Sequence, residues 1–530
     1  MGSKKRAKEE ARKLEIPVVP SYEGPLATIQ KEADRLGFPL VIKATMGGGG
    51  KGMRVVNTLS EFQSAIDACQ REAQSSFGDG DIFLEKYIPF ARHIEVQIFG
   101  DQHGNVVHLF ERDCSLQRRH QKIIEEAPSS LPLPLKKKLY AAALKLARSI
   151  QYENAGTVEF LVDREGNYYF MEMNPRLQVE HPVTEMITGI DLVEWQFRVA
   201  SNEKLPLSQD KIVAKGHGIE LRRYGEDPVR NFKSTVGKVW TRSLPKEGRM
   251  ESGLKEMDTL TPYYDSLLGK LIVGAKTRPE ALAKAKKSLR EWEVLGVMTN
   301  ASLLKNLLQD KKVIQNQIDA AFIDRHISKL APSSPPPDEI YKAASLIQVL
   351  SPHEMKNSPW EQNLNWRLDG NFPFTFEWSW EEHKRKISLI SAREGWTFDS
   401  LKPSIATLSE DILFWENLDI PYWKQGNKIS LIFKGDTYNL TLCTHDPHQV
   451  ISQKREAHLR APLSGKVSAI FVSVGERVKE GQPLLVLEAM KMEHEITAPR
   501  HGRVKRIFYQ VGSLVEEGAE VIDLKEGAKK

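Results

Sequence analysis

The sequence has 530 residues, which at roughly 150 residues per domain corresponds to about three or four domains. Lys and Arg number 75 and Asp and Glu number 70, and the resulting formal charge of +5 is too small to hold nucleic acid or an anionic membrane. Three cysteines without metal-ligand spacing exclude a disulfide scaffold, and no apolar run approaches the ~18 residues of a membrane helix. We therefore expect no nucleic-acid or membrane partner, and a cytoplasmic location, or the mitochondrial matrix if the source is eukaryotic.

A glycine-rich loop is the first feature along the chain that suggests chemistry. Residues 4–15 predict a surface helix, residues 39–43 an apolar strand and residues 53–56 a returning strand. The loop between the strands, residues 47–52, lets backbone N–H groups approach phosphate oxygens, and Lys43 and Lys51 add positive charge. The Gly-Lys-Ser/Thr ending of a P-loop is missing. The loop therefore predicts nucleotide contact, with a flexible turn as the alternative.

Residues 113–122 form a short basic stretch. A nucleic-acid patch is one interpretation, but no aromatic side chains are interleaved with the basic ones. A pocket for small anions is the favoured interpretation.

A predicted hairpin, residues 156–163 and 168–174 around a four-residue loop, carries a pair of acids. Placing Asp163 opposite Tyr168 sets Glu159 across from Glu172 and Thr157 across from Asn174. Apolar side chains then share the opposite face: Val158, Phe160, Val162, Tyr169, Met171 and Met173. Two carboxylates and an amide oxygen on one patch suit Mg²⁺ beside nucleotide phosphates, and solvated surface acids are the alternative.

Two further segments offer charged groups for a reaction. The loop at 174–182 precedes a helical pattern from about 184 to 200, and its Arg176 could neutralise an oxyanion while Glu180 acts as a base or only balances a helix dipole. The adjacent Arg222 and Arg223 are either part of a site or a surface ion-pair turn.

The second half of the chain divides at prolines. Residues 331–339 contain four prolines and predict a stiff linker. Residues 340–455 predict a small β-rich domain, in which clustered tryptophans form a core rather than an aromatic binding platform. From residue 456 onward an internal repeat appears, with Ala461-Pro462 recurring as Ala498-Pro499, and two such halves predict a closed β sandwich with a connector at 488–497.

The connector tip Ala489-Met490-Lys491-Met492, flanked by the repeat, resembles the biotin-attachment domain of biotin-dependent carboxylases. A solvated lysine on a turn is the alternative, and lipoyl domains usually lack the two flanking methionines. The resemblance implies that Lys491 carries covalent biotin, attached by a biotin protein ligase.

Residues 1–330 resemble the biotin carboxylase module of the ATP-grasp superfamily, and the whole chain resembles the biotin-containing α subunit of an acyl-CoA carboxylase of the methylcrotonyl-, propionyl- or acetyl-CoA type. The implied fold is multidomain α+β: the ATP-grasp and C-terminal biotin carboxylase domains at 1–330 with a glycine-loop lid at about 15–87, the linker at 331–339, a β-rich subunit-contact domain at 340–455, and a biotinyl/lipoyl-type sandwich at 456–526. Family members carry another α/β domain ahead of the segment that matches residues 1–4, so this sequence is expected to lack that N-terminal domain.

Family roles transfer onto matching positions. The resemblance implies that ATP contacts Lys4, Lys43, Gly49, Gly50, Glu85, Lys86, Ile88, His93, Gln117 and His120. It implies that Mg²⁺ or Mn²⁺ is held by Glu159, Glu172 and Asn174. Bicarbonate is expected at Lys122, Arg176 and Val179, with Glu180 as its base and Arg222 stabilising the enolate form of biotin. After Arg222 the sequence Arg223-Tyr224-Gly225 replaces the Ile-Asn-Ala-like segment of many members.

The implied reaction is ATP-dependent carboxylation of biotin by bicarbonate, through carboxyphosphate. Acyl transfer requires a separate carboxyltransferase β subunit, so a hetero-oligomer is expected. One alternative is a truncated, catalytically impaired subunit that serves as biotin carrier and assembly partner. Another is a different ATP-grasp enzyme such as a carboxylate–amine ligase.

Overall fold

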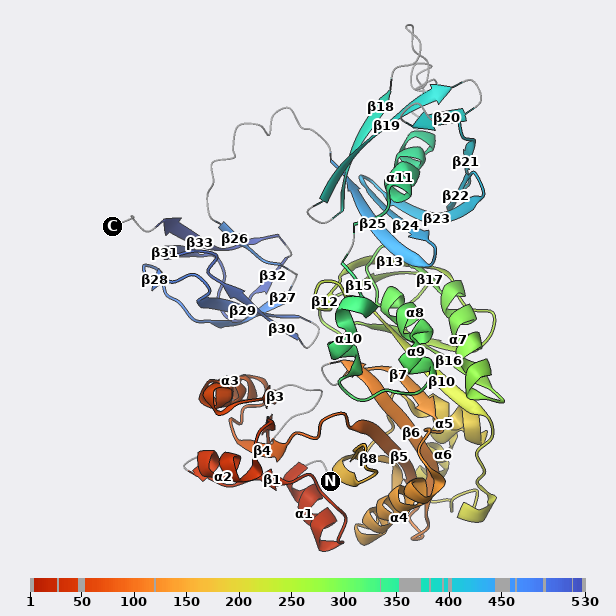
Figure 1. Cartoon of the computed structure of the whole chain (residues 1–530), viewed down its shortest axis with the longest axis vertical. Coiled ribbons are helices and arrows are strands. Elements are labelled where there is room, and N and C mark those ends of the chain that lie inside the picture. The colour runs from red at the N-terminus through yellow and green to blue at the C-terminus, as the bar shows by residue number, and fades with distance from the viewer. Residues whose placement is uncertain are drawn as a thin grey trace.

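A computed structural model of the chain describes residues 4–25, 28–45, 53–118, 121–333, 335–351, 373–380, 383–392, 395–398, 403–443, 458–462, 465–489, 492–516 and 518–526. Figure 1 shows the N-terminal lobe and the large α/β core in red to green, a β-rich unit above the core and a β sandwich to one side. Within these ranges no helix is long and apolar enough to cross a membrane.

The largest sheet of the core has eight antiparallel strands in the order β14-β16-β10-β7-β6-β5-β8-β9. Their bounds are β5 Arg92–Gly100, β6 Val106–Arg118, β7 Gln121–Ala127, β8 Asn154–Val162, β9 Tyr168–Asn174, β10 His217–Tyr224, β14 Arg249–Ser252 and β16 Leu267–Ala275. The helices α1 (Lys4–Lys13) and α4 (Leu133–Ser149) pack on the face that carries Val158 and Phe160. The opposite face carries an apolar cluster that includes Phe99, Leu109 and Ala155, and buried polar side chains such as Glu95 and Glu159.

The predicted hairpin exists as β8 and β9, but its register changes along its length. Glu159 pairs with Glu172 and Thr157 with Asn174, as predicted. Nearer the turn Val162 pairs with Tyr168, so the predicted Asp163–Tyr168 pair and the four-residue loop are wrong. A β-bulge at Met171 absorbs the difference of one residue.

The bulge also corrects the predicted apolar face of β9. Phe170 is fully buried and joins Met173 in the core, and Tyr168 packs against that core. Tyr169 and Met171, which strict alternation placed there, are only half-buried. Alternation fails here because it assumes that every residue of the strand is paired.

A smaller lobe contains the strands on either side of the glycine loop. Its sheet has the order β1-β4-β2-β3, and β2 pairs antiparallel with β3, as predicted for a loop that joins two strands. The bounds are β1 Ser21–Tyr22, β2 Leu40–Ala44, β3 Met53–Val56, β4 Ile82–Lys86, α2 Ile29–Leu36 and α3 Leu59–Phe77. Leu40, Ile42 and Leu84 pack against Phe62 and Ile66 of α3 to form its core. The loop itself lies outside the described residues.

The helical pattern predicted for residues 184–200 is broken in the structure. One helix, α5, spans His181–Thr188 and a second, α6, spans Leu192–Ala200. Gly189 has a φ of 70° and ends α5, and the Asp191 side chain accepts a hydrogen bond from Glu194 N to begin α6.

The remainder of the core surrounds the sheet β15-β13-β17. Its elements are β11 Glu226–Asp227, β12 Lys233–Ser234, β13 Gly237–Ser243, β15 Met257–Leu260, β17 Glu293–Leu295, α7 Arg278–Glu291, α8 Ala301–Gln309, α9 Lys311–Ile314 and α10 Phe322–Leu330. Leucines of α7 and α8 share one apolar cluster with β10 and β16, so this part of the chain packs directly behind the large sheet.

The middle unit is β-rich, as predicted, but begins with a helix. Helix α11 (Asp338–Leu350) packs against a sheet of eight strands whose bounds are β18 Phe374–Trp380, β19 His383–Ala392, β20 Gly395–Phe398, β21 Ala406–Leu408, β22 Ile412–Trp415, β23 Leu418–Gln425, β24 Lys428–Phe433 and β25 Asp436–Leu442. Trp378, Trp380, Trp396 and Trp415 are buried in its core, which agrees with the predicted structural role of the tryptophans.

The middle unit contacts the core along β17. Gly296 N donates a hydrogen bond to Ser430 Oγ at 3.0 Å, and Arg242 pairs with both Glu293 and Asp411. Gly296 has a φ of 96°, and a Cβ there would lie 2.6 Å from the Trp423 ring. Only glycine fits this close approach.

The C-terminal unit is the predicted sandwich of two four-stranded sheets, β26-β33-β31-β28 and β30-β29-β27-β32. The bounds are β26 His458–Arg460, β27 Gly465–Ile470, β28 Arg477–Val478, β29 Pro483–Ala489, β30 Met492–Thr497, β31 Gly502–Ile507, β32 Leu514–Val515 and β33 Glu520–Glu526. Equivalent strands of the two repeats occupy equivalent places in opposite sheets. The connector is a hairpin closed by the pair Ala489–Met492, and Lys491 at its tip lies outside the described residues.

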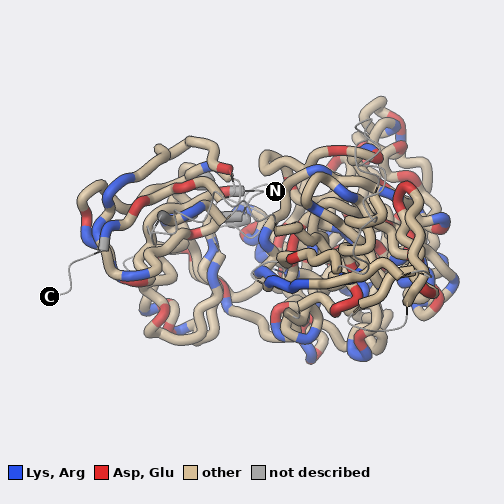
Figure 2. The backbone as a smooth tube through the Cα atoms, turned by 90° about the horizontal axis from the view of Figure 1, so that it is seen from above, with Lys and Arg blue, Asp and Glu red and all other residues tan. Residues whose placement is uncertain are grey.

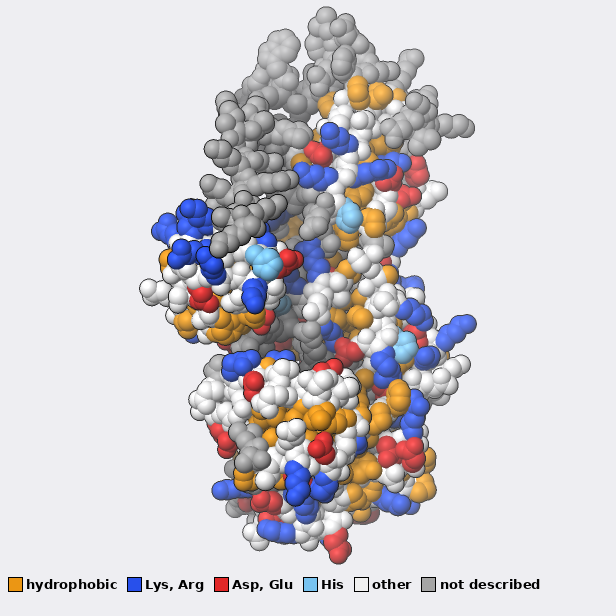
Figure 3. Space-filling model, turned by 60° about the vertical axis from the view of Figure 1, so that its left-hand side comes forward, with side chains coloured by type: hydrophobic (Ala, Val, Ile, Leu, Met, Phe, Trp, Pro, Cys, Tyr) orange, Lys and Arg blue, Asp and Glu red, His pale blue; other side chains and the backbone are white. Residues whose placement is uncertain are grey.

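Basic and acidic residues are both spread over the chain. Figure 2 shows the two kinds scattered along the tube, and on the face in Figure 3 several Lys and Arg side chains gather at the left of the molecule while both signs are mixed elsewhere. The basic stretch at 113–122 is largely internal, because Arg118 is 7% exposed and stacks on Phe232 at 3.6 Å.

Candidate active site

The centre of the candidate site is Lys122 on β7. Its ammonium group lies 2.6 Å from Glu95 and 3.4 Å from Glu159, and it also pairs with Glu180. Burial by itself would lower the pKa of Lys122, but these carboxylates together with Cys114 raise that pKa well above its ordinary value. Lys122 is therefore a permanent cation among acids that would otherwise repel one another.

Glu159 on β8 accepts hydrogen bonds at both carboxylate oxygens. Its Oε2 lies 2.9 Å from His93 Nε2, and Asn174 and Gln178 donate to Oε1 at 2.8 and 2.7 Å. Burial opposes ionisation, yet Lys122 and His93 lower the pKa of Glu159. The same contact with Glu159 outweighs burial and raises the pKa of His93.

Arg222 and Glu180 complete the cluster. Arg222 Nη2 lies 2.7 Å from Glu180, and its Nε donates to Glu125 at 2.5 Å. Burial alone would raise the pKa of Glu180, but Lys122 and Arg222 hold it well below its ordinary value. Both arginines at 222 and 223 are buried in β10, so the alternative of a surface ion-pair turn is wrong.

Arg112 is the main residue of the site that sequence analysis missed. It is completely buried on β6 and donates to Glu95, Gln97, Gln178 and Thr184 at 2.5, 2.7, 2.8 and 3.0 Å. It thereby fixes both Glu95 and the loop that carries Glu180. Glu95 could have been found from its place two residues after His93 on one strand, but Arg112 has no local signal because its partners lie on β5, in the loop before α5 and on α5.

A second group of charges lies in the smaller lobe. Glu85 on β4 is 2% exposed and pairs with Lys43 on β2 and with Lys8 on α1. The helix predicted over residues 4–15 is confirmed at 4–13, but Lys8 and Ala7 are buried rather than on the surface. The pair with Lys8 connects α1 to the smaller sheet.

The other predicted site residues are distributed as follows. Gln117 donates to His93 Nδ1 at 3.1 Å, whereas Arg176 and Val179 are exposed on the loop before α5. The Lys86 ammonium group donates to the carbonyl oxygens of Gly37 and Phe38 at 2.7 and 3.2 Å, and Ile88 follows β4. Lys4 begins α1. The remaining positions lie outside the described residues: Gly49, Gly50, His120 and Lys491.

The donor set on β8 and β9 suits a hard divalent cation. Glu159 and Glu172 are directly paired, so their side chains leave the same face, and Asn174 stands two residues along that face. Nitrogen donors from Asn174, Gln178 and Lys122 converge on Glu159 Oε1, which marks it as a strong centre of negative charge. Carboxylate and amide oxygens are the ligands that Mg²⁺ accepts.

Behind Arg222 lies a buried pair of acids, Glu125 and Glu220. The two residues are directly paired between β7 and β10, and neither oxygen of Glu220 has a hydrogen-bond partner among the described residues. Burial, and then Glu125, raise the pKa of Glu220 well above its ordinary value. Glu220 is therefore a neutral acid, and Arg222 forms its ion pairs with Glu125 and Glu180 instead.

Glu220→Gln tests this protonation state. Above about pH 4.5 the unfolded chain has lost the Glu220 proton, whereas the folded chain keeps it. The free energy of unfolding of the wild type therefore falls as the pH rises, by at most about 1.4 kcal/mol per pH unit. We expect the variant to gain stability over wild type between pH 5 and 8, and to match it below pH 4.5. Urea unfolding across this pH range measures the difference, with the exposed Glu194→Gln as control. A difference that does not change with pH would contradict the prediction.

Three family models match the chain. Residues 3–208 match the carbamoyl-phosphate synthase L chain ATP-binding domain, residues 220–325 the biotin carboxylase C-terminal domain, and residues 457–524 the biotin-requiring enzyme domain. Together with the charged cluster on the large sheet, they define the class of protein as an ATP-dependent ligase of the ATP-grasp type whose cofactors are biotin, ATP and Mg²⁺.

Known proteins and structures specify the family. The mitochondrial methylcrotonoyl-CoA carboxylase α subunit of Dictyostelium discoideum is 36% identical over 526 residues, covering 93% of this chain and 75% of that protein. The biotin carboxylase of Halalkalibacterium halodurans is 47% identical over 333 residues, covering 62% and 74%. The chain therefore belongs to the family of biotin carboxylases and biotin-containing carboxylase α subunits, and its reaction is ATP-dependent carboxylation of biotin.

Solved structures agree. The biotin carboxylase domain of Hydrogenobacter thermophilus 2-oxoglutarate carboxylase, in complex with MgADP, ADP and bicarbonate, has a TM-score of 0.61 at 40% identity and covers 63% of this chain and 75% of that one. A Campylobacter jejuni biotin carboxylase, described as a β-γ-ATP complex, has a TM-score of 0.59 at 43% identity, covering 62% of this chain and 74% of that one.

Proposed function

We propose that this chain carries out the first half-reaction of an acyl-CoA carboxylase of the methylcrotonyl-CoA or propionyl-CoA type, with Lys491 as the biotin attachment site. The observation that carries the proposal is the convergence of Lys122, Arg222, Glu159 and Glu180 on the large sheet. Two cations and two ionised acids there provide binding for an anion beside a base. The proposed division is a catalytic part at 1–330, a linker at 331–337, a subunit-contact domain at 338–455 and a carrier at 456–526, because Asp338 and Glu339 of the predicted linker belong to α11.

Lys122 and Arg222 are proposed to hold the substrate anion. Both are fixed cations that now neutralise Glu180, so bicarbonate entering between them would exchange one carboxylate partner for another. Arg176 and Val179, exposed at the same loop, are placed by the proposal at the mouth of this site. Glu180 is ionised at physiological pH and is proposed to accept the bicarbonate proton once its cations turn to the substrate.

The proposed reaction proceeds through carboxyphosphate. A bicarbonate oxygen attacks the γ-phosphorus of ATP, ADP leaves, and the resulting carboxyphosphate divides into CO₂ and phosphate. Phosphate takes the proton from the biotin ureido nitrogen, and that nitrogen bonds to CO₂. Arg222 is proposed to stabilise the negative charge on the ureido oxygen.

The nucleotide is proposed to lie between the two lobes. Lys43, Glu85, Ile88, His93 and Gln117 are the described candidates for its contacts, joined by Lys4, Lys86, Gly49, Gly50 and His120. The Lys86 ammonium group already donates to backbone carbonyls. Lys86 is therefore proposed to contact the nucleotide through its main chain, at the end of β4. Glu159, Glu172 and Asn174 would hold Mg²⁺ or Mn²⁺, which neutralises phosphate charge when bound.

The partner is proposed to be a separate carboxyltransferase β subunit that contacts the middle unit and selects the acyl-CoA. Support comes from the methylcrotonoyl-CoA carboxylase relatives, which are named as α subunits. A biotin protein ligase is the second proposed partner. Biotin carrier and assembly partner without catalysis is the alternative function.

The variant Lys491→Arg distinguishes the role of the chain as a biotin carrier from its catalytic activity. When the full chain is co-expressed with a biotin ligase, we expect wild type to shift with streptavidin and the variant to show no shift. With free biotin, both should release ADP in a bicarbonate-dependent manner, because the change leaves the catalytic lobe intact. Biotinylated wild type that releases no ADP with Mg²⁺, ATP and bicarbonate would support the carrier alternative, and a variant that still shifts would remove Lys491 as the attachment site.

A further inference from the structure

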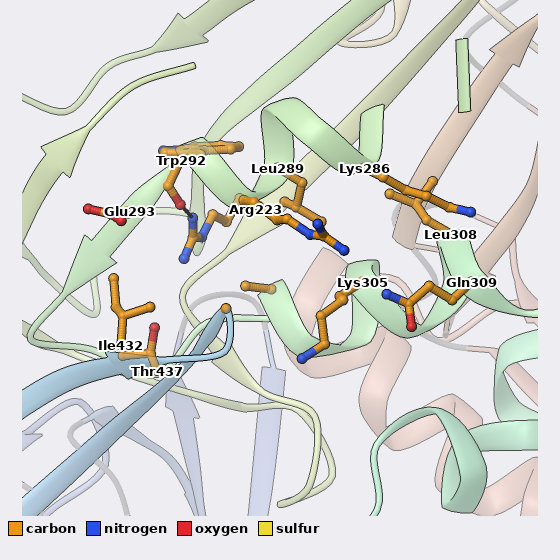
Figure 4. Close-up of a pocket in the computed structure, with 13 residues that line it drawn as sticks. Arg223, Lys286, Leu289, Trp292, Glu293, Lys305, Leu308, Gln309, Ile432 and Thr437 are labelled. Atoms are coloured by element: carbon orange, nitrogen blue, oxygen red, sulfur yellow. Dashed lines mark hydrogen bonds between the residues drawn. The ribbon is translucent and has the colours of Figure 1, made fainter. Parts of the chain in front are cut away.

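A pocket separate from the active site lies where the core meets the middle unit. Figure 4 shows it between α7, α8 and the turn that joins β24 to β25, with Arg223 beneath Trp292. About 500 Å³ of empty space lies at the pocket when the open solvent at its mouth is counted, and its closed interior is narrow. Apolar side chains from both units form its walls, and these are Leu289, Leu308, Trp292, Ala301 and Ile432.

Arg223 at the base of the pocket is a buried cation on which Glu293 acts only at a distance longer than an ion pair. It is 2% exposed, its Nε lies 3.3 Å from Thr299 Oγ1, Nη1 donates to the Trp292 carbonyl, and its guanidinium lies 5.1 Å from the Trp292 ring centroid. Among the described residues no carboxylate oxygen lies within 4.0 Å of it. Burial lowers the pKa of Arg223 to about 9, so it remains charged at neutral pH.

Positive charge at the pocket exceeds negative charge. Lys305 and Glu293 are neutralised by Asp436 and Arg242 respectively. The other charged side chains that line it are Arg223, Lys286 and Arg290, and in the described part of the chain neither of the last two pairs with a carboxylate. Of these three cations only Arg223 is buried, while half-buried Lys286 and exposed Arg290 stand at the edge of the apolar space. Burying the Arg223 charge unpaired is costly.

We propose that this pocket binds a small organic carboxylate, with its carboxylate on Arg223 and its aliphatic body against Leu289, Leu308 and Ile432. A guanidinium fork matches a carboxylate in geometry as well as in charge. The narrow, apolar interior favours a slender monoanion over inorganic phosphate. Because the walls come from both units, the bound carboxylate bridges the core and the middle unit.

Arg223 also connects the pocket to the active site through one strand. Arg222 and Arg223 are consecutive on β10, so their side chains leave opposite faces. Arg222 faces Glu180 and Glu125, and Arg223 faces the pocket. The carboxylate is therefore bound directly behind the catalytic sheet.

Calorimetric titration of the full chain with sodium hexanoate tests the proposal. We expect saturable binding at one site, weaker binding of inorganic phosphate and none of hexylammonium. Arg223→Met keeps an unbranched side chain beside Trp292 but removes the charge, and should weaken hexanoate binding roughly tenfold to hundredfold. The matched control is Arg198→Met on the exposed face of α6, which should bind as wild type does.

A second variant tests the same pocket in case Arg223→Met does not fold. Ile432→Trp fills the pocket from the middle unit without changing its charge, and should also abolish hexanoate binding. Wild type that shows no saturable binding would overturn the proposal. So would unchanged affinity in both Arg223→Met and Ile432→Trp.

Discussion

Replacing Glu180 by glutamine is expected to lower bicarbonate-dependent ADP release by about 10²–10⁴-fold, the range for loss of a positioned general base. The amide retains the size of the side chain and can still accept a hydrogen bond from Lys122. It cannot take a proton from bicarbonate, and it leaves Lys122 and Arg222 with one negative partner fewer. Initial rates with free biotin, measured at saturating ATP and Mg²⁺, report the effect.

The control for Glu180→Gln is Glu194→Gln on α6, an exposed acid paired with Arg198. It should retain the wild-type rate. Streptavidin shift of both variants checks that the carrier has folded and been modified. A rate within twofold of wild type in a folded Glu180→Gln chain would exclude this residue as the base.

The second large effect is expected on stability. Arg112→Met removes the guanidinium that holds Glu95, Gln97 and Gln178, and leaves Glu95 buried with Lys122 as its ion-pair partner. Breaking a buried ion pair from one side costs about 3–5 kcal/mol. We therefore expect the catalytic part to unfold at a distinctly lower urea concentration.

Pulse proteolysis in urea measures this change, because the fragment that survives reports the catalytic part separately from the carrier. Arg198→Met serves again as the control, since its ion pairs with Glu194 and Glu203 lie on an exposed helix face and should contribute little to stability. Equal midpoints for Arg112→Met and wild type would show that the buried network does not stabilise the fold.

Local patterns in the sequence predicted the parts of the fold that depend on neighbours in the chain. The repeat around Ala461 and Ala498 predicted the sandwich, and the prolines before Asp338 predicted the boundary ahead of the middle unit. The register assumed for the hairpin predicted that Glu159 faces Glu172. It failed beside the turn, because a bulge is set by tertiary packing of Phe170 and leaves no mark in the period of the strand.

Only part of the candidate site could be predicted from the sequence. Charged residues near a recognisable motif, such as Lys122 and Glu180, were identified, but their mutual pairing was not. Arg112, Glu125 and Glu220 escaped because each lies within a strand whose neighbours belong to distant segments. Arg223 was assigned to the surface as one option, since an arginine beside another arginine rarely signals a buried position.

The bulge at Met171 has a consequence for how the hairpin tolerates sequence drift. The strands pair in one register beside the turn and in another beside Glu159 and Glu172. The direction of the side chains is therefore set separately in the two parts of the hairpin. Lengthening or shortening the surface loop at 163–167 can be absorbed ahead of the bulge. The spacing of Glu159 and Glu172 is thereby insulated from variation at the tip.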